Sequence, residues 1–351
     1  MLKGSNVGGQ PVRAIADVAR LAGVAKATAS RALSGRGYVS DETRQKVVDA
    51  ARSIGYVASP NAASLVTGRT KSVGVIIPFI NRWFFAEVLE GMEIALLEQG
   101  YDMTLYNLPA ASPERDRIFE YFLARKRFDA VISVGVALSE TEVDQLHRLG
   151  RPLVGIGGPI RGVNTIAIDD VEAARLATEH LLSLGHTNIV HVGGVLVDEM
   201  DFAVHSNRLR GFTTAMMNAG LPTDGCFYAS EFTLPGGYAR GLEILGDPRR
   251  RPTAIFAACD EIAVGILVAA RELGITVPAE LSVIGIDGHP YADMFRLTTL
   301  EQRPHEQGRL AVMSLLAELD NPTEHRGAGE LTELPPRLVM RASTSCPRPR
   351  T

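Results

Sequence analysis

The sequence predicts a small all-α helix-turn-helix unit followed by an α/β body of two doubly wound parallel-sheet lobes. Two observations support this prediction. The chain has 351 residues, 46% hydrophobic and 22% charged, enough for more than one domain with its own core. Residues 12–56 show helical periodicity, whereas strand-sized apolar runs alternate with amphipathic helical segments from residue 73 onward.

Composition excludes several other classes of protein. The longest apolar runs, such as Val73–Ile77, are the length of strands and too short for a membrane helix. The segment Met1–Gln10 is polar and Gly-rich, unlike a secretory signal. The three cysteines are scattered, which favours neither a disulfide framework nor a metal site. We therefore expect a cytoplasmic protein without membrane contact, metal or cofactor.

Charge is distributed unevenly along the chain. Residues 1–71 contain 11 Lys and Arg against four Asp and Glu, a net charge of +7. The remainder contains 25 basic and 36 acidic residues, a net charge of −11. A basic head on an acidic body is typical of a nucleic-acid-binding module joined to a body that avoids nucleic acid. A chance cluster on a solvated face is the alternative.

The amino-terminal segment favours three short helices. Apolar residues at helical spacing precede Gly23, a second helix is expected at Lys26–Leu33, and Ser40 caps a third that stops at Gly55. Two helices joined by a tight turn and supported by a third form a helix-turn-helix.

The second helix carries the candidate DNA contacts. Its hydrogen-bond donors are Lys26, Thr28, Ser30 and Arg31. Ala25, Ala27 and Ala29 are small enough to let the backbone approach the major groove. We expect phosphate contacts to set affinity, and base contacts from Lys26 or Arg31, most simply to guanine, to set specificity. The alternative is a three-helix packing unit with an incidentally basic face.

The body contains two series of strand-like segments. A helix with its apolar face at Phe85, Val88, Leu89, Met92 and Leu96 follows the first strand. Ligands in such folds bind at the carboxyl ends of parallel strands, here between the two lobes. No catalytic set emerges: Gly155–Gly158 lacks the spacing of a dinucleotide fingerprint, and His289 near Asp287 fits loop hydrogen bonding better than catalysis.

The amino-terminal motifs resemble the headpiece of the LacI/GalR family of bacterial repressors. The matching segments are Ile15–Gly23, Val24–Leu33, Val39–Arg44 and Ile54–Tyr56. The resemblance implies base contacts from Lys26, Ala27 and Arg31, although Ala27 is limited to packing against a thymine methyl.

The linker at residues 57–72 resembles the hinge of the same family. The resemblance implies a short helix at 61–67 that folds on operator DNA and a minor-groove wedge at Leu65. Pro60, with Ala58 in the usual proline position, and Ala63 in place of Arg depart from the pattern. Leu65 packing on the body is the alternative.

The body resembles the effector domain of this family and the periplasmic sugar-binding proteins. The matching segments include Arg208–Phe212, Pro252–Glu261, Ser282–Asp287 and Leu338–Ser343. The resemblance implies ligand contacts from Phe84, Phe85, Arg208, Phe232 and Asp287, with Cys259 in place of a frequent Asn and Gly288 in place of the usual second Asp. Asn81 and Trp83, just before Phe84, are additional candidates.

Four of these cleft residues have a structural alternative. Phe84 and Phe85 are also suited to the start of a helix core, although adjacent residues cannot both face one core. Arg208 and Asp287 are also suited to an ion pair across the cleft.

The expected domains are a helix-turn-helix at 1–56, a hinge at 57–72, an effector and dimerisation body at 73–345, and a tail at 346–351. We expect lobe 1 at 73–169 and 301–329, and lobe 2 at 170–300 and 330–345. Only eight residues follow Ser343, which leaves no tetramerisation helix and favours a homodimer.

The expected function is a repressor that binds a near-palindromic double-stranded operator under the control of a small effector, a carbohydrate. A nucleobase or nucleoside co-repressor is the alternative effector. A solute-binding transport protein and a sugar-metabolising enzyme are the competing functions.

Overall fold

The computed structural model describes the chain as two compact units, residues 1–71 and 72–351. It describes residues 14–34, 37–56, 68–108, 128–136, 138–148, 150–195, 201–321 and 329–348, together with Arg115, Arg117 and Phe119. None of the described helices is long and apolar enough to cross a membrane. Of the hinge expected at 57–72, residues 57–67, including Leu65, lie outside the described residues.

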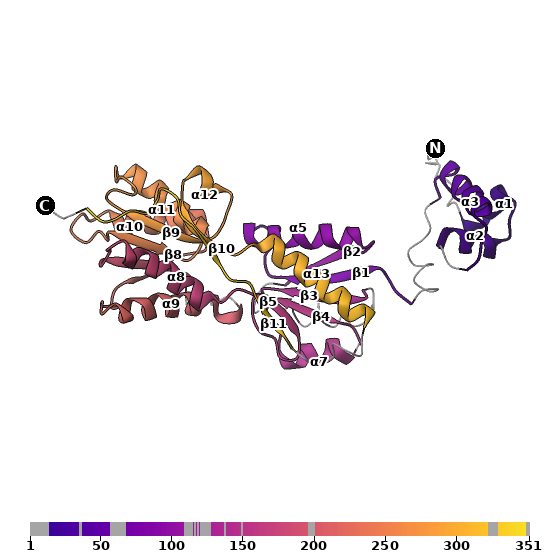
Figure 1. The fold of residues 1–351 in the computed structure, drawn as a ribbon, viewed down its shortest axis with the longest axis horizontal. Helices are drawn as coiled ribbons and strands as arrows, with labels where there is room; N and C mark the ends of the chain where they lie inside the picture. The colour runs from indigo at the N-terminus through magenta and orange to yellow at the C-terminus, as the bar shows by residue number, and fades with distance from the viewer. Residues whose placement is uncertain are drawn as a thin grey trace, which may run out of the picture. The chain divides into compact units, whose positions relative to one another are not determined.

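The first unit is a three-helix headpiece made of α1 (Ile15–Ala22), α2 (Lys26–Ser34) and α3 (Asp41–Ser53) (Figure 1). Gly23 ends α1 with a φ of 67°, a left-handed conformation that favours glycine and turns the chain into α2. Ser40 caps α3 by accepting a hydrogen bond from the Thr43 backbone N–H at 3.4 Å.

Small side chains fill the headpiece core. Val18, Ala29 and Val47 are completely buried, one from each helix. The expectation that Ala29 lies on the DNA-facing side is therefore wrong, because this position of α2 faces α1 and α3. Ala25 and Ala27 are exposed and leave the outer side of α2 free of bulky apolar groups.

The first lobe of the body is a six-stranded parallel sheet in the order β11-β5-β4-β3-β1-β2. The strands are β1 (Ser72–Ile77), β2 (Asp102–Asn107), β3 (Ala130–Val134), β4 (Leu153–Ile156), β5 (Asn164–Ala167) and β11 (Leu331–Glu333). Figure 1 shows α5 (Trp83–Glu98) and α13 (Pro304–Asp320) beside each other on one face, with α7 (Glu140–Arg148) on the other.

The second lobe is a six-stranded sheet in the order β12-β10-β9-β8-β6-β7, parallel except for β12. The strands are β6 (Ile189–Gly193), β7 (Phe227–Ala229), β8 (Ala254–Ala257), β9 (Ser282–Asp287), β10 (Thr298–Glu301) and β12 (Arg337–Val339). Helices α8 (Asp170–Ser183) and α9 (Val204–Asn218) cover one face, and α10 (Leu234–Leu245) and α11 (Asp260–Glu272) cover the other (Figure 1). A short α12 (Tyr291–Met294) precedes β10.

These observations confirm the predicted fold class. The strands β1, β3, β8 and β9, which lie inside the sheets, are nearly continuous apolar runs, which is typical of parallel sheets covered on both faces.

The chain crosses between the lobes three times, and one crossing differs from the expected boundary. The first two lead from β5 to α8 and from β10 to α13. Residues 331–333 were assigned to lobe 2, but they form β11 and pair in parallel with β5 of lobe 1. Glu301, placed at the start of the second part of lobe 1, instead ends β10 in lobe 2. The third crossing therefore lies between Glu333 and Arg337.

Candidate functional site

The outer side of α2 carries the candidate DNA-contacting residues of the headpiece. Lys26, Ala27 and Arg31 are exposed, and Thr28 and Ser30 are half-buried. Arg44 of α3 donates a hydrogen bond to the Ala32 carbonyl at 3.0 Å and thereby holds the C-terminal half of α2 against α3. Helix α2 thus presents the cationic side chains of Lys26 and Arg31 at the surface while its inner side is held against α3.

A cavity of about 800 Å³, part of it open to solvent, lies between the two lobes of the body. Residues from both lobes and from the crossing segments contribute to it, as the topology predicts. It is lined by Arg82, Trp83, Phe84, Phe85, Gly135, Gly157, Ile168, Asp170, Phe202, Val204, Arg208, Phe232, Cys259, Glu261, Asp287, Gln302 and Gln307.

The start of α5 supplies the aromatic wall from lobe 1. Phe85 is 3% exposed and belongs to the core, and Phe84 packs against its edge with ring centroids 5.3 Å apart. Trp83, the single tryptophan of the chain, contacts His289 of lobe 2 at 4.6 Å between ring centroids. Asn81 is exposed and does not line the cavity, so the structure does not bring it to the site.

Arg208 of α9 lies on the lobe 2 side and pairs with Asp170, the first residue of α8. Its Nε donates to Asp170 Oδ1 at 2.8 Å, and its Nη1 donates to the Ala258 carbonyl. A Cβ at Gly211 would lie 2.2 Å from the Val171 carbonyl oxygen, so this glycine allows the close approach of α9 to α8. The sequence suggested Asp287 as the ion-pair partner of Arg208, but the nearest carboxylate is that of Asp170.

Burial shifts the pKa values of this pair. It raises the pKa of the Asp170 carboxyl, and the guanidinium opposes that rise. Burial also disfavours the charged form of Arg208, but the carboxylates of Asp170 and Asp287 outweigh it and raise its pKa. The guanidinium is therefore charged at neutral pH and has a carboxylate within hydrogen-bonding distance.

Asp287 ends β9 at the floor of the cavity. Gln302 Nε2 donates to its Oδ1 at 2.5 Å, and the backbone N–H of Asp260 donates to its Oδ2 at 3.4 Å. Burial raises the pKa of Asp287 to about 8, the charge of Asp260 adds to the rise, and Arg208 opposes it. The carboxyl group is therefore largely protonated at neutral pH.

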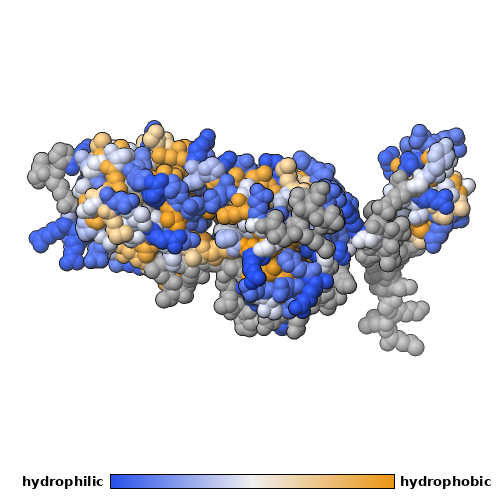
Figure 2. Space-filling view, turned by 60° about the horizontal axis from the view of Figure 1, so that its bottom comes forward, coloured by the Kyte–Doolittle hydropathy of each residue, from blue (hydrophilic) through white to orange (hydrophobic). Residues whose placement is uncertain are grey.

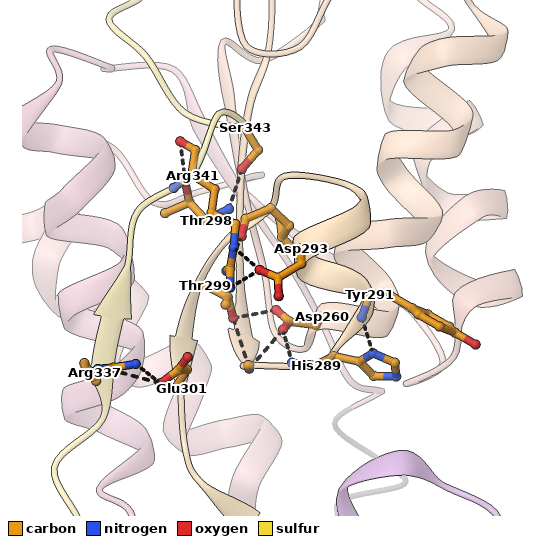
Figure 3. A network of polar contacts seen from close by, with 12 residues as sticks. Asp260, His289, Tyr291, Asp293, Thr298, Thr299, Glu301, Arg337, Arg341 and Ser343 are labelled. Carbon is orange, nitrogen blue, oxygen red and sulfur yellow. Dashed lines mark hydrogen bonds and ion pairs between the residues drawn. The ribbon is translucent and has the colours of Figure 1, made fainter.

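Behind Asp287, Asp260 holds the adjoining turn together, as Figure 3 shows. Its Oδ1 accepts from Thr299 Oγ1 at 2.6 Å, and its Oδ2 accepts from the backbone N–H groups of Gly288 and His289 at 3.0 and 2.8 Å. Burial raises the pKa of Asp260 to about 6, against the effect of these hydrogen bonds. Both oxygens are used within the fold, so Asp260 is a supporting residue.

The remaining part of the lobe 2 wall combines aromatic rings with a thiol. Phe232 lies against His205 with ring centroids 4.6 Å apart. Phe202 approaches lobe 1 so closely that a Cβ at Gly158 would lie 2.5 Å from its ring. Cys259 precedes α11, and burial raises its pKa well above the ordinary value, so it presents a neutral thiol.

The structure places seven of the eight candidate ligand residues around one cavity: Trp83, Phe84, Phe85, Arg208, Phe232, Cys259 and Asp287. Sequence reasoning missed Arg82, Asp170, Phe202, Glu261, Gln302 and Gln307 as lining residues. Among these residues, only Asp170 could have been recognised from the sequence, because it directly follows the first predicted crossing between the lobes. Within the described residues, no group of three or more His, Cys, Asp or Glu side chains is arranged to hold a metal ion.

Comparison with known proteins matches both units. Residues 14–60 match bacterial regulatory proteins of the lacI family, and residues 178–344 match a periplasmic binding protein-like domain. The HTH-type transcriptional regulator DegA of Bacillus subtilis (strain 168) is 33% identical over 339 residues, covering 94% of this chain and 98% of DegA. The chain belongs to the LacI family. The resemblance inferred from sequence motifs is confirmed, and the protein is a DNA-binding transcriptional regulator with a ligand-binding domain.

Other members of the LacI family match over most of the chain. The HTH-type transcriptional repressor PurR of Edwardsiella ictaluri (strain 93-146) is 33% identical, covering 94% of this chain and 96% of PurR. The structure of the transcriptional regulator CelR with cellobiose matches with a TM-score of 0.67 and 27% identity, covering 94% of this chain and 99% of CelR.

Two further structures extend the comparison. A LacI family regulator from Enterococcus faecium with bound ribose has a TM-score of 0.68 and 28% identity, covering 78% of this chain and 99% of the regulator. The Lac repressor dimer bound to operator and the anti-inducer ONPF has a TM-score of 0.81 over 95% of this chain and 99% of that chain. At 23% identity, this last match supports the fold alone.

Proposed function

We propose that the protein is a homodimeric repressor whose affinity for a near-palindromic operator is controlled by a small carbohydrate bound between its lobes. The observation that carries this proposal is the cavity of about 800 Å³, lined by aromatic and charged side chains from both lobes. A ligand that contacts both lobes favours one relative arrangement of them and shifts the population toward or away from the DNA-binding state.

On the DNA side, Lys26 and Arg31 reach base edges, and Ala27 packs against a thymine methyl. Thr28 and Ser30 contact phosphates. The exposure of the two cations on α2 supports these roles. Leu65 is the proposed minor-groove wedge of the hinge at 57–72.

On the effector side, a carbohydrate suits flat rings for its apolar faces and an Arg–Asp set for its hydroxyl groups. Two similar structures contain cellobiose and ribose, which supports this choice. A nucleobase or nucleoside is the second candidate, since Phe232 lines the cavity and its ring could stack on a base.

The dimer is supported by large apolar side chains that reach the surface of the body (Figure 2). Leu97 of α5, Met294 of α12 and Met340 are 60%, 77% and 71% exposed. A two-fold symmetric pair would bury such residues and place two headpieces on two half-sites. We further infer that the protein works in the cytoplasm and has no enzymatic activity, as its relatives are transcriptional regulators.

A thermal-shift screen followed by operator binding tests this proposal. Monosaccharides, disaccharides, polyols and nucleosides are tested first, since a ligand at 100 times its Kd stabilises the protein by about 2.7 kcal/mol. Operator DNA selected from random sequence is then titrated with and without the hit. A hit that leaves operator affinity unchanged would refute effector control.

Replacing Arg31 tests the DNA-binding surface. Arg31→Ala should reduce affinity for the selected operator by at least about tenfold, because a base contact contributes about 1–3 kcal/mol to discrimination. Affinity for unrelated DNA should fall much less. Arg52→Ala on α3 removes the same charge from an exposed site and is the control. Equal effects of the two changes would contradict the assignment of α2 as the base-contacting helix.

A further inference from the structure

On the basis of the function proposed for the cavity, we propose that its ligand is an uncharged, hydroxyl-bearing ring molecule and that the cavity rejects phosphorylated or carboxylated forms. The charged side chains that line the cavity carry this proposal. The only cations among the described lining residues are Arg82 and Arg208, and Arg208, the buried one, is paired with the carboxylate of Asp170.

Arg208 is the only cation at the floor of the cavity, and a carboxylate of the fold already neutralises it. Its side chain and that of Asp170 are 6% and 8% exposed, and their atoms lie 2.8 Å apart. A ligand phosphate would have to displace Asp170 or share the guanidinium with it. Displacement would leave a buried carboxylate without its partner, which is strongly unfavourable.

Asp287 adds no attraction for an anion in either protonation state. A protonated Asp287 leaves the floor neutral, and an ionised Asp287 makes it negative. Asp260 lies directly behind it, with its backbone N–H 3.4 Å from Asp287 Oδ2. A phosphate or carboxylate placed here would therefore meet like charge or no charge, at the cost of losing its hydration.

The second cation, Arg82, is the residue before α5. Its guanidinium lies over the Phe79 ring, 4.0 Å from the ring centroid, and Glu261 of α11 also lines the cavity. Burial raises the pKa of Glu261, and the charge of Arg82 opposes that rise. The other polar lining groups are uncharged: two amides, a thiol and the indole N–H of Trp83, while five aromatic rings supply flat apolar faces. This set matches hydroxyl groups and ring faces, and its buried cation, Arg208, is already paired with a carboxylate.

Matched pairs of compounds provide the first test. Glucose and glucose 6-phosphate, ribose and ribose 5-phosphate, cellobiose and cellobionic acid, and adenosine and AMP are compared by calorimetry at constant ionic strength. We expect binding only among uncharged members, with at least about tenfold weaker binding of the charged partner. Tighter binding of a phosphate, a carboxylate or an amino sugar such as glucosamine would overturn the proposal.

Inorganic phosphate provides a second test that needs no knowledge of the effector. Phosphate is titrated against potassium chloride of equal ionic strength, with thermal stability and Trp83 fluorescence as readouts. Wild type should show no specific response. Asp170→Asn frees the guanidinium and should increase phosphate affinity at least about tenfold, and Asp170→Asn with Arg208→Gln should lose that gain.

Asp169→Asn is the matched control, because the exposed neighbour loses the same charge and asparagine also caps helices well. A phosphate response of wild type that Arg208→Gln abolishes would overturn the proposal, as would a folded Asp170→Asn protein without any gain. If Asp170→Asn does not fold, the wild-type titration decides. An anionic ligand that alters operator binding would refute the charge argument and leave the proposed function intact.

Discussion

The two walls of the cavity differ in chemistry. Lobe 1 contributes mainly aromatic rings from the start of α5 and glycines from the loops after β3 and β4. Arg82 is its one charged residue among the described residues that line the cavity. Lobe 2 contributes four charged side chains, Asp170, Arg208, Glu261 and Asp287. Buried charges need partners within their own lobe, whereas apolar rings gain contact area from any surface that closes on them. We therefore propose that lobe 2 orients the ligand and that lobe 1 covers it.

Removing the central charge of lobe 2 should have the largest effect. Arg208→Ala leaves Asp170 buried without its cation and should lower the free energy of unfolding by about 3–5 kcal/mol. Urea denaturation measures this change. Arg210→Ala, at an exposed position of the same helix, should change stability by less than about 0.5 kcal/mol. Similar small losses for both variants would remove the distinction between the walls.

The adjacent residues Phe84 and Phe85 test the lobe 1 wall. Phe85→Ala should destabilise the protein by about 3–5 kcal/mol, because Phe85 is a buried core residue. Phe84→Ala should destabilise the protein less than Phe85→Ala does. It should instead lower the affinity for the ligand found in the screen by about tenfold, since stacking contributes about 0.5–1.5 kcal/mol beyond the burial of apolar surface. Unfolding curves and calorimetry measure the two effects. Reversal of the pattern would mean that Phe84 is the core residue.

The pH dependence of stability tests the buried carboxyl group of Asp287 in the lobe 2 wall. The folded protein keeps a proton on Asp287 up to about pH 8, whereas the carboxyl group has an ordinary pKa of 3.8. The folded state thus binds more protons, so the free energy of unfolding falls as pH rises toward 8.

Measurements between pH 7 and 8 emphasise this effect, because the ordinary pKa values of histidine and carboxyl groups lie below this range. Urea unfolding at pH 7.0, 7.5 and 8.0 should show a decline in wild type that Asp287→Asn reduces. An unchanged slope in the variant would assign the proton to another group.

The smallest effect is expected just outside the aromatic wall. Asn81 is exposed and does not line the cavity. Asn81→Ala should leave both stability and ligand affinity within about 0.5 kcal/mol of wild type. Calorimetry with the identified ligand is the measurement, and a tenfold loss of affinity would extend the lobe 1 wall beyond Trp83.

The sequence by itself determined the local features of this protein. Helical periodicity and the turn at Gly23 gave the headpiece, because i to i+4 packing and the left-handed glycine are properties of neighbouring residues. Alternating apolar strands and helices gave the two-lobed body. Motif resemblance gave six of the cavity-lining residues, and proximity to Phe84 in the sequence added Trp83, which lines the cavity, and Asn81, which does not.

Tertiary structure decided everything that depends on residues far apart in the chain. Arg208 pairs with Asp170, 38 positions away, because a glycine lets α9 approach α8. Strand β11 returns to lobe 1 because its backbone groups find partners on the open edge of β5. Tertiary packing also sets the charge of the cavity floor, because burial and neighbouring carboxylates determine which groups are ionised. The distances between these groups depend on the fold and cannot be deduced from a local sequence pattern.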